Sequence, residues 1–290
     1  MKQLLLIFCV LLLSSCGHEG PGVRVGRFDQ SAARGEMPSD TAALAALFAA
    51  SGYGELSGSS LAAYAAQPSI AYHLEAVDSA FADLSWLESK LWPSHRYYAI
   101  ISPFNQSVIT VDSLVFIGLN HYLGEDYSAY GYFPDFVRKR KVKARILPDV
   151  AEAIVRAENP FEPSGTFPTA IERMVYEGAV AQKVMEMTGL PEREVLGYDT
   201  DEYSWAKANE AQAWSELTRR RLLFSTDPDV ARQLTALSPA TTILTPDAPG
   251  AYGRYIGLQI VKAYLDSHPG VNFLTDRLYN SPSLLQDSGY

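Results

Sequence analysis

The sequence predicts an α+β protein that is mostly helical, in which a small antiparallel sheet is followed by helices. Three observations lead to this prediction. Apolar residues repeat at helical spacing over much of the chain, short runs rich in Tyr, Ile and Val cluster between residues 96 and 119, and capping signals mark several helix starts. The chain has 290 residues, of which 47% are hydrophobic and 20% charged, so it can bury a sizeable core.

The N-terminus carries the most specific short signal. Lys2 precedes a short apolar run, Leu4–Leu13, which is too short to span a bilayer, and Ser14 and Ser15 then lead to Cys16. This segment resembles a bacterial lipobox, in which the chain is cut before a cysteine that is then acylated; an ordinary secretory signal with an incidental cysteine is the alternative. We therefore expect a signal peptide at residues 1–15 and a protein held at a bacterial membrane through acyl chains, such as palmitate, on Cys16.

Cysteine content and charge exclude several classes of site and partner. The two cysteines, Cys9 and Cys16, both lie in this segment, so the processed chain would have no disulfide and no thiolate metal site. The net charge of −9 argues against a nucleic-acid partner. We expect the membrane, reached through the lipidated Cys16, and envelope proteins as partners.

The N-terminal third begins with an irregular segment. Residues 16–39 are rich in Gly, Ser and charge without periodicity, and we expect a flexible tether there, followed by a single domain over residues 40–290. Asp40 can cap a helix that continues to Ala50. Further helices are expected at Ser60–Ala66 and at Ile70–Leu91.

The hydrophobic period then changes from helical to extended. Arg96–Ser102, Ser107–Asp112 and Leu114–Leu119 are expected to form the strands of the sheet. The aromatic stretch Tyr122–Phe136 is expected to be an ordered loop that either lines a cleft or packs over the sheet, and packing is the more common outcome. The six basic residues within Arg138–Arg145 indicate a solvated edge or, alternatively, a dock for lipid headgroups or an acidic partner.

Two central helices within Leu147–Met187 follow, joined by a loop at Asn159–Phe167. Thr169 and Glu172 have the spacing of a capping box at the start of the second helix, which is expected to end near Gly189. Glu177 lies on an otherwise apolar stripe of this helix. A buried carboxylate is costly unless a partner or solvent reaches it, so Glu177 is the first candidate functional residue; pairing with a nearby Arg or Tyr is the structural alternative.

The C-terminal part is predicted to be helical. A helix is expected from Tyr203 to about residue 224, and the acidic residues Asp199, Asp201 and Glu202 before it are better explained by the helix dipole than by a calcium loop, because the EF-hand glycine and spacing are missing. Another helix is expected at Ala251–Ser267. Its two glycines, at positions 253 and 257, lie one turn apart and permit close helix packing.

Several catalytic motifs are missing. A zinc peptidase helix needs His-Glu-x-x-His, because residues four apart place two imidazoles on one metal, and no two of the five histidines are four apart. The Gly-x-Ser-x-Gly elbow and the phosphate-binding Gly-rich loop are also missing. Acidic residues are plentiful, but their spacing selects no catalytic pair. We therefore expect no enzymatic activity, no metal and no cofactor.

Several segments together indicate a family. They are, in chain order, Val115–Leu119, His121–Gly124, Ile146–Asp149, Met174–Gly178, Trp205–Trp214 with its Asn-Glu pair, and Pro249–Val261. In this order, behind a lipobox, they resemble the gliding motility lipoprotein GldB family of the Bacteroidetes, over the chain from about residue 70 onward. The resemblance implies a lipid-anchored protein of the gliding or secretion machinery in the cell envelope.

That family in turn resembles gluzincin-type zinc metallopeptidases, which implies a zincin-like architecture. In this resemblance Ile146–Pro148 is the entry to the metal-binding helix, Ala153 and Ala157 fall where the two zinc-binding histidines would lie, and Glu177, followed by Gly178, is retained. A single carboxylate cannot hold a zinc ion. The resemblance therefore implies a peptidase scaffold without its metal.

The remnant cleft expected from this resemblance has Glu177, Tyr252 and Arg254 as its candidate residues. We expect a non-catalytic structural or partner-binding role. Two alternatives remain open from the sequence. One is a peptidase-like hydrolase that uses carboxylates or an unconventional metal in the same cleft. The other is a glycan- or peptide-binding lipoprotein that uses the aromatic stretch Tyr122–Phe136.

Overall fold

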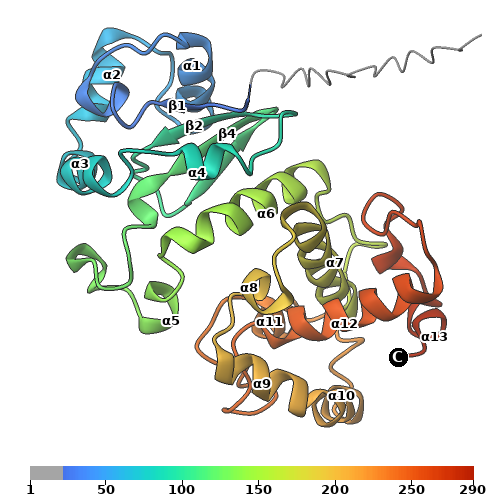
Figure 1. Ribbon diagram of the computed structural model, residues 1–290. Helices are drawn as coiled ribbons and strands as arrows, with labels where there is room; N and C mark the ends of the chain where they lie inside the picture. The colour runs from blue at the N-terminus through green and yellow to red at the C-terminus, as the bar shows by residue number, and fades with distance from the viewer. Residues whose placement is uncertain (1–21) are drawn as a thin grey trace, which may run out of the picture.

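The computed structural model describes residues 22–290 (Figure 1). The expected signal peptide, residues 1–15, and the expected lipidation site, Cys16, lie outside the described residues. Within residues 22–290, no helix combines the length and the apolar character needed to cross a bilayer.

The described chain is mixed α+β with more helix than strand. The strands are β1 (Val25–Arg27), β2 (Arg96–Ile100), β3 (Val108–Val111) and β4 (Leu114–Gly118). The helices are α1 (Thr41–Ala50), α2 (Gly58–Ala65), α3 (Pro68–Ala80), α4 (Ser85–Glu88), α5 (Asp135–Arg138), α6 (Ile146–Glu158), α7 (Ala170–Thr188), α8 (Glu192–Leu196), α9 (Thr200–Ala208), α10 (Glu210–Arg219), α11 (Pro228–Thr235), α12 (Tyr252–Ser267) and α13 (Leu284–Ser288).

The four strands form one mixed sheet in the order β1-β2-β4-β3. The three strands expected between residues 96 and 119 are confirmed, but the expected antiparallel arrangement is wrong. Only β3 and β4 are antiparallel, whereas β2 pairs in parallel with both β4 and β1. Asp112, at a φ of 50°, turns the chain tightly between β3 and β4, so β3 becomes the edge and β4 returns to lie beside β2. The alternation of apolar and polar residues along a strand does not show which strand will pair with it, or in which direction.

Strand β1 lies inside the segment for which the sequence predicts a tether. Val25 is buried, Phe28 stacks on Tyr98 with ring centroids 4.5 Å apart, and the fully buried Asp29 accepts hydrogen bonds from Arg27. The prediction of a flexible tether is therefore wrong for residues 25–34. Gly26 is needed for contact rather than for flexibility, because a Cβ there would lie 2.6 Å from Cδ1 of Tyr98.

Helix boundaries follow the local capping signals. Asp40 accepts from the backbone of Ala43 at the start of α1, as predicted. The long helix expected at Ile70–Leu91 is instead divided into α3 and α4, since the Asp83 carboxylate accepts from both the backbone and the hydroxyl of Ser85. The helix expected from Tyr203 likewise divides at Asn209, between α9 and α10.

The two central helices are confirmed as α6 and α7. Thr169 and Glu172 form the predicted capping box, and Gly189, at a φ of 67°, ends α7 in the left-handed region. Asp199 forms a second capping box with Glu202 at the start of α9. The acidic residues there thus open a helix, as the dipole argument predicted.

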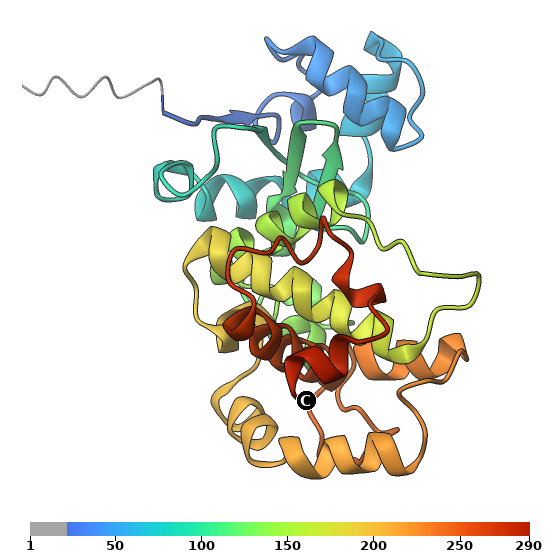
Figure 2. The same cartoon turned by 90° about the vertical axis from the view of Figure 1, so that its right-hand side faces the viewer.

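Helix α6 lies between two hydrophobic cores. Ile146, Val150 and Ile154 pack against the sheet and the N-terminal helices, whereas Ala151 and Val155 pack against the C-terminal helices. Figure 1 and the turned view in Figure 2 both show α6 between the sheet and the crossed pair α7 and α12. A polar residue on the face of α6 toward the C-terminal helices can therefore contact α7 and α12, while the opposite face of α6 packs against the sheet.

Candidate functional site

Helices α7 and α12 touch through their backbones. A Cβ on Gly257 would lie 2.5 Å from the carbonyl carbon of Met174, and a Cβ on Gly178 would lie 2.5 Å from the Gly257 oxygen. Only glycine permits this approach, and the close packing predicted at Gly257 is confirmed. The contact brings Glu177 of α7 and Arg254 of α12 to the same region facing α6.

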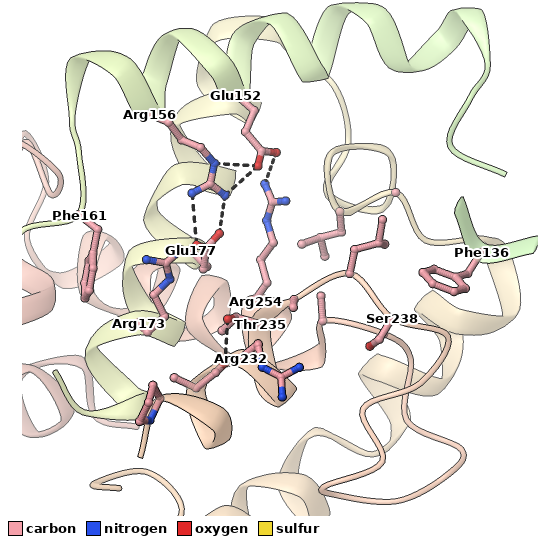
Figure 3. A pocket seen from close by; sticks show the side chains of 18 of the residues that line it. Phe136, Glu152, Arg156, Phe161, Arg173, Glu177, Arg232, Thr235, Ser238 and Arg254 are labelled. Carbon is pink, nitrogen blue, oxygen red and sulfur yellow. Dashed lines mark hydrogen bonds and ion pairs between the residues drawn. The ribbon is translucent and has the colours of Figure 1, made fainter. Parts of the chain in front are cut away.

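Five charged side chains from three helices form what we call the ionic cluster (Figure 3). Its members are Glu152 and Arg156 from α6, Arg173 and Glu177 from α7, and Arg254 from α12. Arg156 lies between the two carboxylates, with Nη2 2.8 Å from Oε1 of Glu152 and Nη1 3.2 Å from Oε1 of Glu177. Arg173 Nη2 lies 2.9 Å from Oε1 of Glu177, and Arg254 Nη2 donates to Oε2 of Glu152 at 2.7 Å.

The two carboxylates of the cluster are both paired with guanidinium groups, and those beside Glu152 hold it in the charged form. Burial alone would raise the pKa of Glu152, but Arg254 and Arg156 outweigh burial and lower this pKa well below its ordinary value. Glu177, with 4% of its surface exposed, is paired with Arg156 and Arg173. The structural alternative for Glu177, a buried carboxylate paired with Arg, is thus confirmed.

The ionic cluster forms part of the wall of a cavity of about 740 Å³. The lining carries a cationic excess, with six basic side chains, Lys139, Arg140, Arg156, Arg173, Arg232 and Arg254, and three acidic ones, Glu152, Glu177 and Glu202. Phe167 and Leu237, which are 74% and 51% exposed, also belong to the lining. A cavity with a basic lining and apolar side chains at its open side suits an anionic ligand that also has an apolar part.

Arg140 is held against the cavity wall by a backbone carbonyl rather than by a carboxylate. Its Nη1 donates to the carbonyl of Leu196, the last residue of α8, at 3.1 Å. A Cβ on Gly197 would lie 2.8 Å from Cζ of Arg140, and Gly197 also has a φ of 71°. Gly197 therefore both ends α8 and leaves room for the guanidinium.

A family comparison identifies the chain. A family profile described as gliding motility protein GldB matches residues 54–290. The chain belongs to the GldB family. Neither a search of curated proteins nor a search of solved structures found a significant match. Membership of the GldB family makes this a gliding motility-related protein of the cell envelope.

Among the three cleft residues predicted from the sequence, two line the cavity of this GldB-family chain. Glu177 and Arg254 are in its wall, but Tyr252 is not. Tyr252 is fully buried, donates to the carbonyl of Ala206 at 2.7 Å and stacks on Tyr255. Placing Tyr252 in the cleft was wrong, because at the start of α12 it points into the helical core rather than toward α6.

The residues of α6 that face Glu177 differ from those indicated by the peptidase resemblance. Ala153 and Ala157 are partly or fully exposed, whereas Glu152 and Arg156, also four residues apart, reach the cavity. Histidines lie elsewhere: His95 is 3.7 Å from Glu158, and the side chain of His268 stacks on Tyr264. Over residues 22–290 no group of three or more His, Cys, Asp or Glu side chains is arranged to hold a metal ion.

The aromatic stretch Tyr122–Phe136 packs mainly over the fold. Tyr122 and Tyr130 are buried, and the Tyr130 hydroxyl donates to the carbonyl of Asn120. Tyr132 is exposed, and Phe136 belongs to the cavity lining. Packing, the more common of the two expected outcomes, therefore accounts for most of the stretch, and only Phe136 joins the candidate site.

The basic segment Arg138–Arg145 is a solvated edge only in part, since Lys139 and Lys143 are exposed. Arg145 is buried, forms an ion pair with Asp149 at 2.6 Å and donates to the carbonyl of Glu194 near the end of α8. Lys141 is also buried, with Nζ 3.0 Å from Nδ1 of His121. The prediction of a solvated edge was wrong for Arg145 and Lys141, whose side chains turn inward. Arg145 reaches carbonyls near the end of α8, which favour cations, and Lys141 reaches His121.

Sequence reasoning missed four residues of the site: Glu152, Arg156, Arg173 and Arg140. A signal for the first two existed, since Glu and Arg four residues apart on a helix are neighbours. Arg140 had no such signal. Its position depends on the C-terminal end of α8, which lies more than fifty residues further along the chain.

Proposed function

We propose that this GldB-family protein is a lipid-anchored component of the gliding machinery of the cell envelope that binds a partner through its cavity without catalysing a reaction. The observation that carries this proposal is the ionic cluster. Both carboxylates of the cluster are already paired with guanidinium groups, and Glu202, the third carboxylate of the cavity wall, accepts from the backbone of Asp199. The cavity therefore offers charge for binding rather than a free acid or base.

A carboxylate that acts as a general acid or base needs a pKa near the working pH and an oxygen that is free to exchange a proton. Glu152 has a pKa well below its ordinary value because Arg254 and Arg156 stabilise its charge. Both oxygens of Glu177 accept hydrogen bonds from Arg156. This arrangement supports a non-catalytic role.

The peptidase-like origin of the scaffold belongs to the same proposal. It rests on the resemblance, and α6 supports it at positions one residue before the two that the resemblance indicates. Glu152 and Arg156 lie four residues apart on α6, and Arg156 pairs with Glu177 of α7. The guanidinium of Arg156 supplies positive charge between two carboxylates, which is the electrostatic role that a metal ion would otherwise have. We infer that the scaffold keeps a peptidase-like arrangement in which an arginine stands in place of the ion.

The absence of catalysis is tested with the full-length purified protein. We expect no stoichiometric metal by elemental analysis and no cleavage in a broad peptide screen. One zinc per chain, with turnover that is lost in Glu177→Gln but kept in Glu216→Gln on α10, would show that the protein is a hydrolase. Circular dichroism of Glu177→Gln separates lost chemistry from lost folding.

The anchor is tested in cells of the source bacterium. Replacing Cys16 with Ala should abolish labelling of the protein by a palmitate analogue and release it from the membrane fraction, because acyl chains contribute about 0.8 kcal/mol per buried methylene. Equal labelling and equal membrane retention of Cys16→Ala would refute lipidation at this residue. Cys9→Ala is the matched control and should behave as the wild type.

Partner binding through the cavity is tested by crosslinking. The sequence has cysteine only at positions 9 and 16, so Thr235→Cys in the cavity wall places one reactive thiol there. With a thiol-reactive photocrosslinker we expect a discrete adduct with one envelope protein from intact cells. Glu216→Cys, on the exposed side of α10, is the control. The same adduct from both positions, or none from Thr235→Cys, would contradict the proposal.

A further inference from the structure

We propose that the cavity binds a carboxylate of an apolar peptide, with the guanidinium groups of Arg140 and Arg254 as its ligands. This inference rests on the proposed partner-binding function and names the chemistry of the segment that enters the cavity. It is carried by the donors that the ionic cluster leaves unused and by the apolar side chains beside them.

Arg254 is largely buried yet only partly satisfied. The residue is 8% exposed, and its Nη2 donates to Glu152. Its Nε is buried and has no acceptor among the described residues, and none of their hydrogen bonds uses its Nη1. Figure 3 shows the guanidinium extending from α12 toward Glu152 with its other terminal nitrogen turned toward the open cavity. A buried donor without an acceptor is unfavourable, so a ligand oxygen there would be stabilised.

Arg140 supplies a second guanidinium without a paired carboxylate. Its hydrogen bond to the Leu196 carbonyl occupies one terminal nitrogen, and no ion pair within residues 22–290 includes Arg140. Burial, followed by repulsion from Arg145, lowers the pKa of Arg140 to about 10, and Arg254 adds to this repulsion. A bound anion would relieve both effects, because it compensates the buried charge and separates the like charges.

The planar, forked donors of arginine match the two oxygens of a carboxylate. The remaining lining favours a peptide over a small inorganic anion. Apolar surface at the cavity comes from Phe136, Phe167 and Leu237. Of these, Phe167 and Leu237 are largely exposed. The cavity volume of about 740 Å³ also exceeds what one small ion needs and lies within the range of pockets for larger ligands, about 300 to 1,000 Å³.

The carboxylate could belong to a chain terminus or to an acidic side chain, and peptide pools distinguish the two. Three pools of N-acetylated tetrapeptides, randomised over Phe, Leu, Ala and Gly, are compared: C-terminal acids, C-terminal amides, and amides with one Glu added. Each pool is equilibrated with the full-length protein in nanodiscs, and bound peptides are quantified by mass spectrometry. We expect one of the carboxylate pools to bind at least about tenfold better than the plain amides, which is about 1.4 kcal/mol.

Preference for the C-terminal acid pool assigns a chain terminus, and preference for the Glu pool assigns a side chain. Arg140→Gln should remove this preference without unfolding the protein, since Arg140 pairs with no carboxylate. Arg254→Gln should also remove the preference, but with a loss of stability because Glu152 loses one of its two guanidinium partners. Arg219→Gln on α10 should bind as the wild type. Equal binding of acids and amides, or an unchanged preference in Arg140→Gln, would overturn the inference.

The crosslinking test separates this inference from the proposed function. A specific adduct from Thr235→Cys together with no carboxylate preference leaves partner binding in place and removes only the ligand chemistry. Carboxylate preference without an adduct in cells leaves the binding site in place and removes the envelope partner.

Discussion

Two buried polar groups of the molecule balance their charges differently. In the ionic cluster, Arg156 lies between the Glu152 and Glu177 carboxylates, so each buried charge has an opposite charge beside it. The pair of His121 and Lys141, near the end of β4, contains no carboxylate. There, burial and the nearby lysine lower the pKa of His121 to about 4, and burial also lowers the pKa of Lys141. The first group keeps its charges by pairing, whereas the second favours the neutral form of His121.

The hydrogen bonds of the second group fix one form of the imidazole. Since the Lys141 ammonium is a donor, Nδ1 of His121 accepts, and its Nε2 then carries the proton that is donated to the Phe104 carbonyl at 2.9 Å. A second proton on His121 would point at the lysine. From this difference we expect that removing a side chain from the ionic cluster destabilises the fold. For the His121–Lys141 pair, we expect the free energy of unfolding to depend mainly on pH.

The largest expected effect comes from breaking the helix contact that assembles the ionic cluster. Gly257→Ala should lower the free energy of unfolding by at least about 3 kcal/mol, because the new methyl group would overlap the Met174 backbone, which cannot rotate away. Denaturant unfolding measures the change. Gly58→Ala, where no atom lies within 4 Å of the new Cβ, is the control and should be nearly neutral. Wild-type stability of Gly257→Ala would contradict the close approach of α7 and α12.

Removing the central cation of the ionic cluster is expected to have the next largest effect. Arg156→Met should destabilise by about 3 kcal/mol, at the lower end of the range for a broken buried pair because Arg156 is partly exposed. Chemical denaturation of the variant and of Arg219→Met, which loses only a surface pair with Glu216, gives the comparison. We expect no measurable change in Arg219→Met. Similar stabilities of the two variants would show that the cluster does not depend on Arg156.

The response of the second group to pH has a definite sign. The unfolded state protonates His121 near its ordinary pKa of 6.5, while the folded state resists protonation until about pH 4. The free energy of unfolding should therefore fall by about 2.6 kcal/mol as the pH drops from 6.5 to 4. His121→Gln can accept from Lys141 and donate to Phe104 without titrating, so its stability should change less over this range. His268→Gln should keep the wild-type pH dependence, and an equal pH response of His121→Gln would contradict this assignment.

The smallest effect is expected from replacing the lysine of the second group. Lys141→Met should change the free energy of unfolding by less than about 1 kcal/mol, because the lost ammonium has no carboxylate partner and methionine keeps apolar contact with Tyr130 and Phe133. Thermal and denaturant unfolding at pH 7 measure this. A loss as large as that expected for Arg156→Met would remove the contrast between the two groups.

Much of the fold could be predicted from local signals. The capping residues Asp40 and Thr169 and the left-handed Gly189 mark helix ends through hydrogen bonds within a few residues, which a sequence displays directly. Strand β1 could not be predicted, because three residues are too few to show the alternation of a strand, and a glycine in a polar segment usually indicates a flexible chain. The role of Gly26 depends on Tyr98, more than seventy residues away.

The candidate site was predictable only in part for the same reason. Glu177 is conspicuous because it interrupts an apolar stripe, and the glycine spacing around Arg254 indicates close packing. The inward turn of Arg140 and Lys141 was not predictable, since a basic run has the same composition whether water or buried polar groups surround it. Tyr252 was misplaced because spacing alone does not say which side of α12 faces the cavity.

Because β1 pairs with β2, the folded domain begins close to the proposed anchor, and this limits how far the sheet can lie from the membrane. Under the proposed acylation of Cys16, only eight residues separate the anchor from Val25, and that length of chain extends at most about 30 Å. The edge of the sheet therefore stays within one bilayer thickness of the lipid surface.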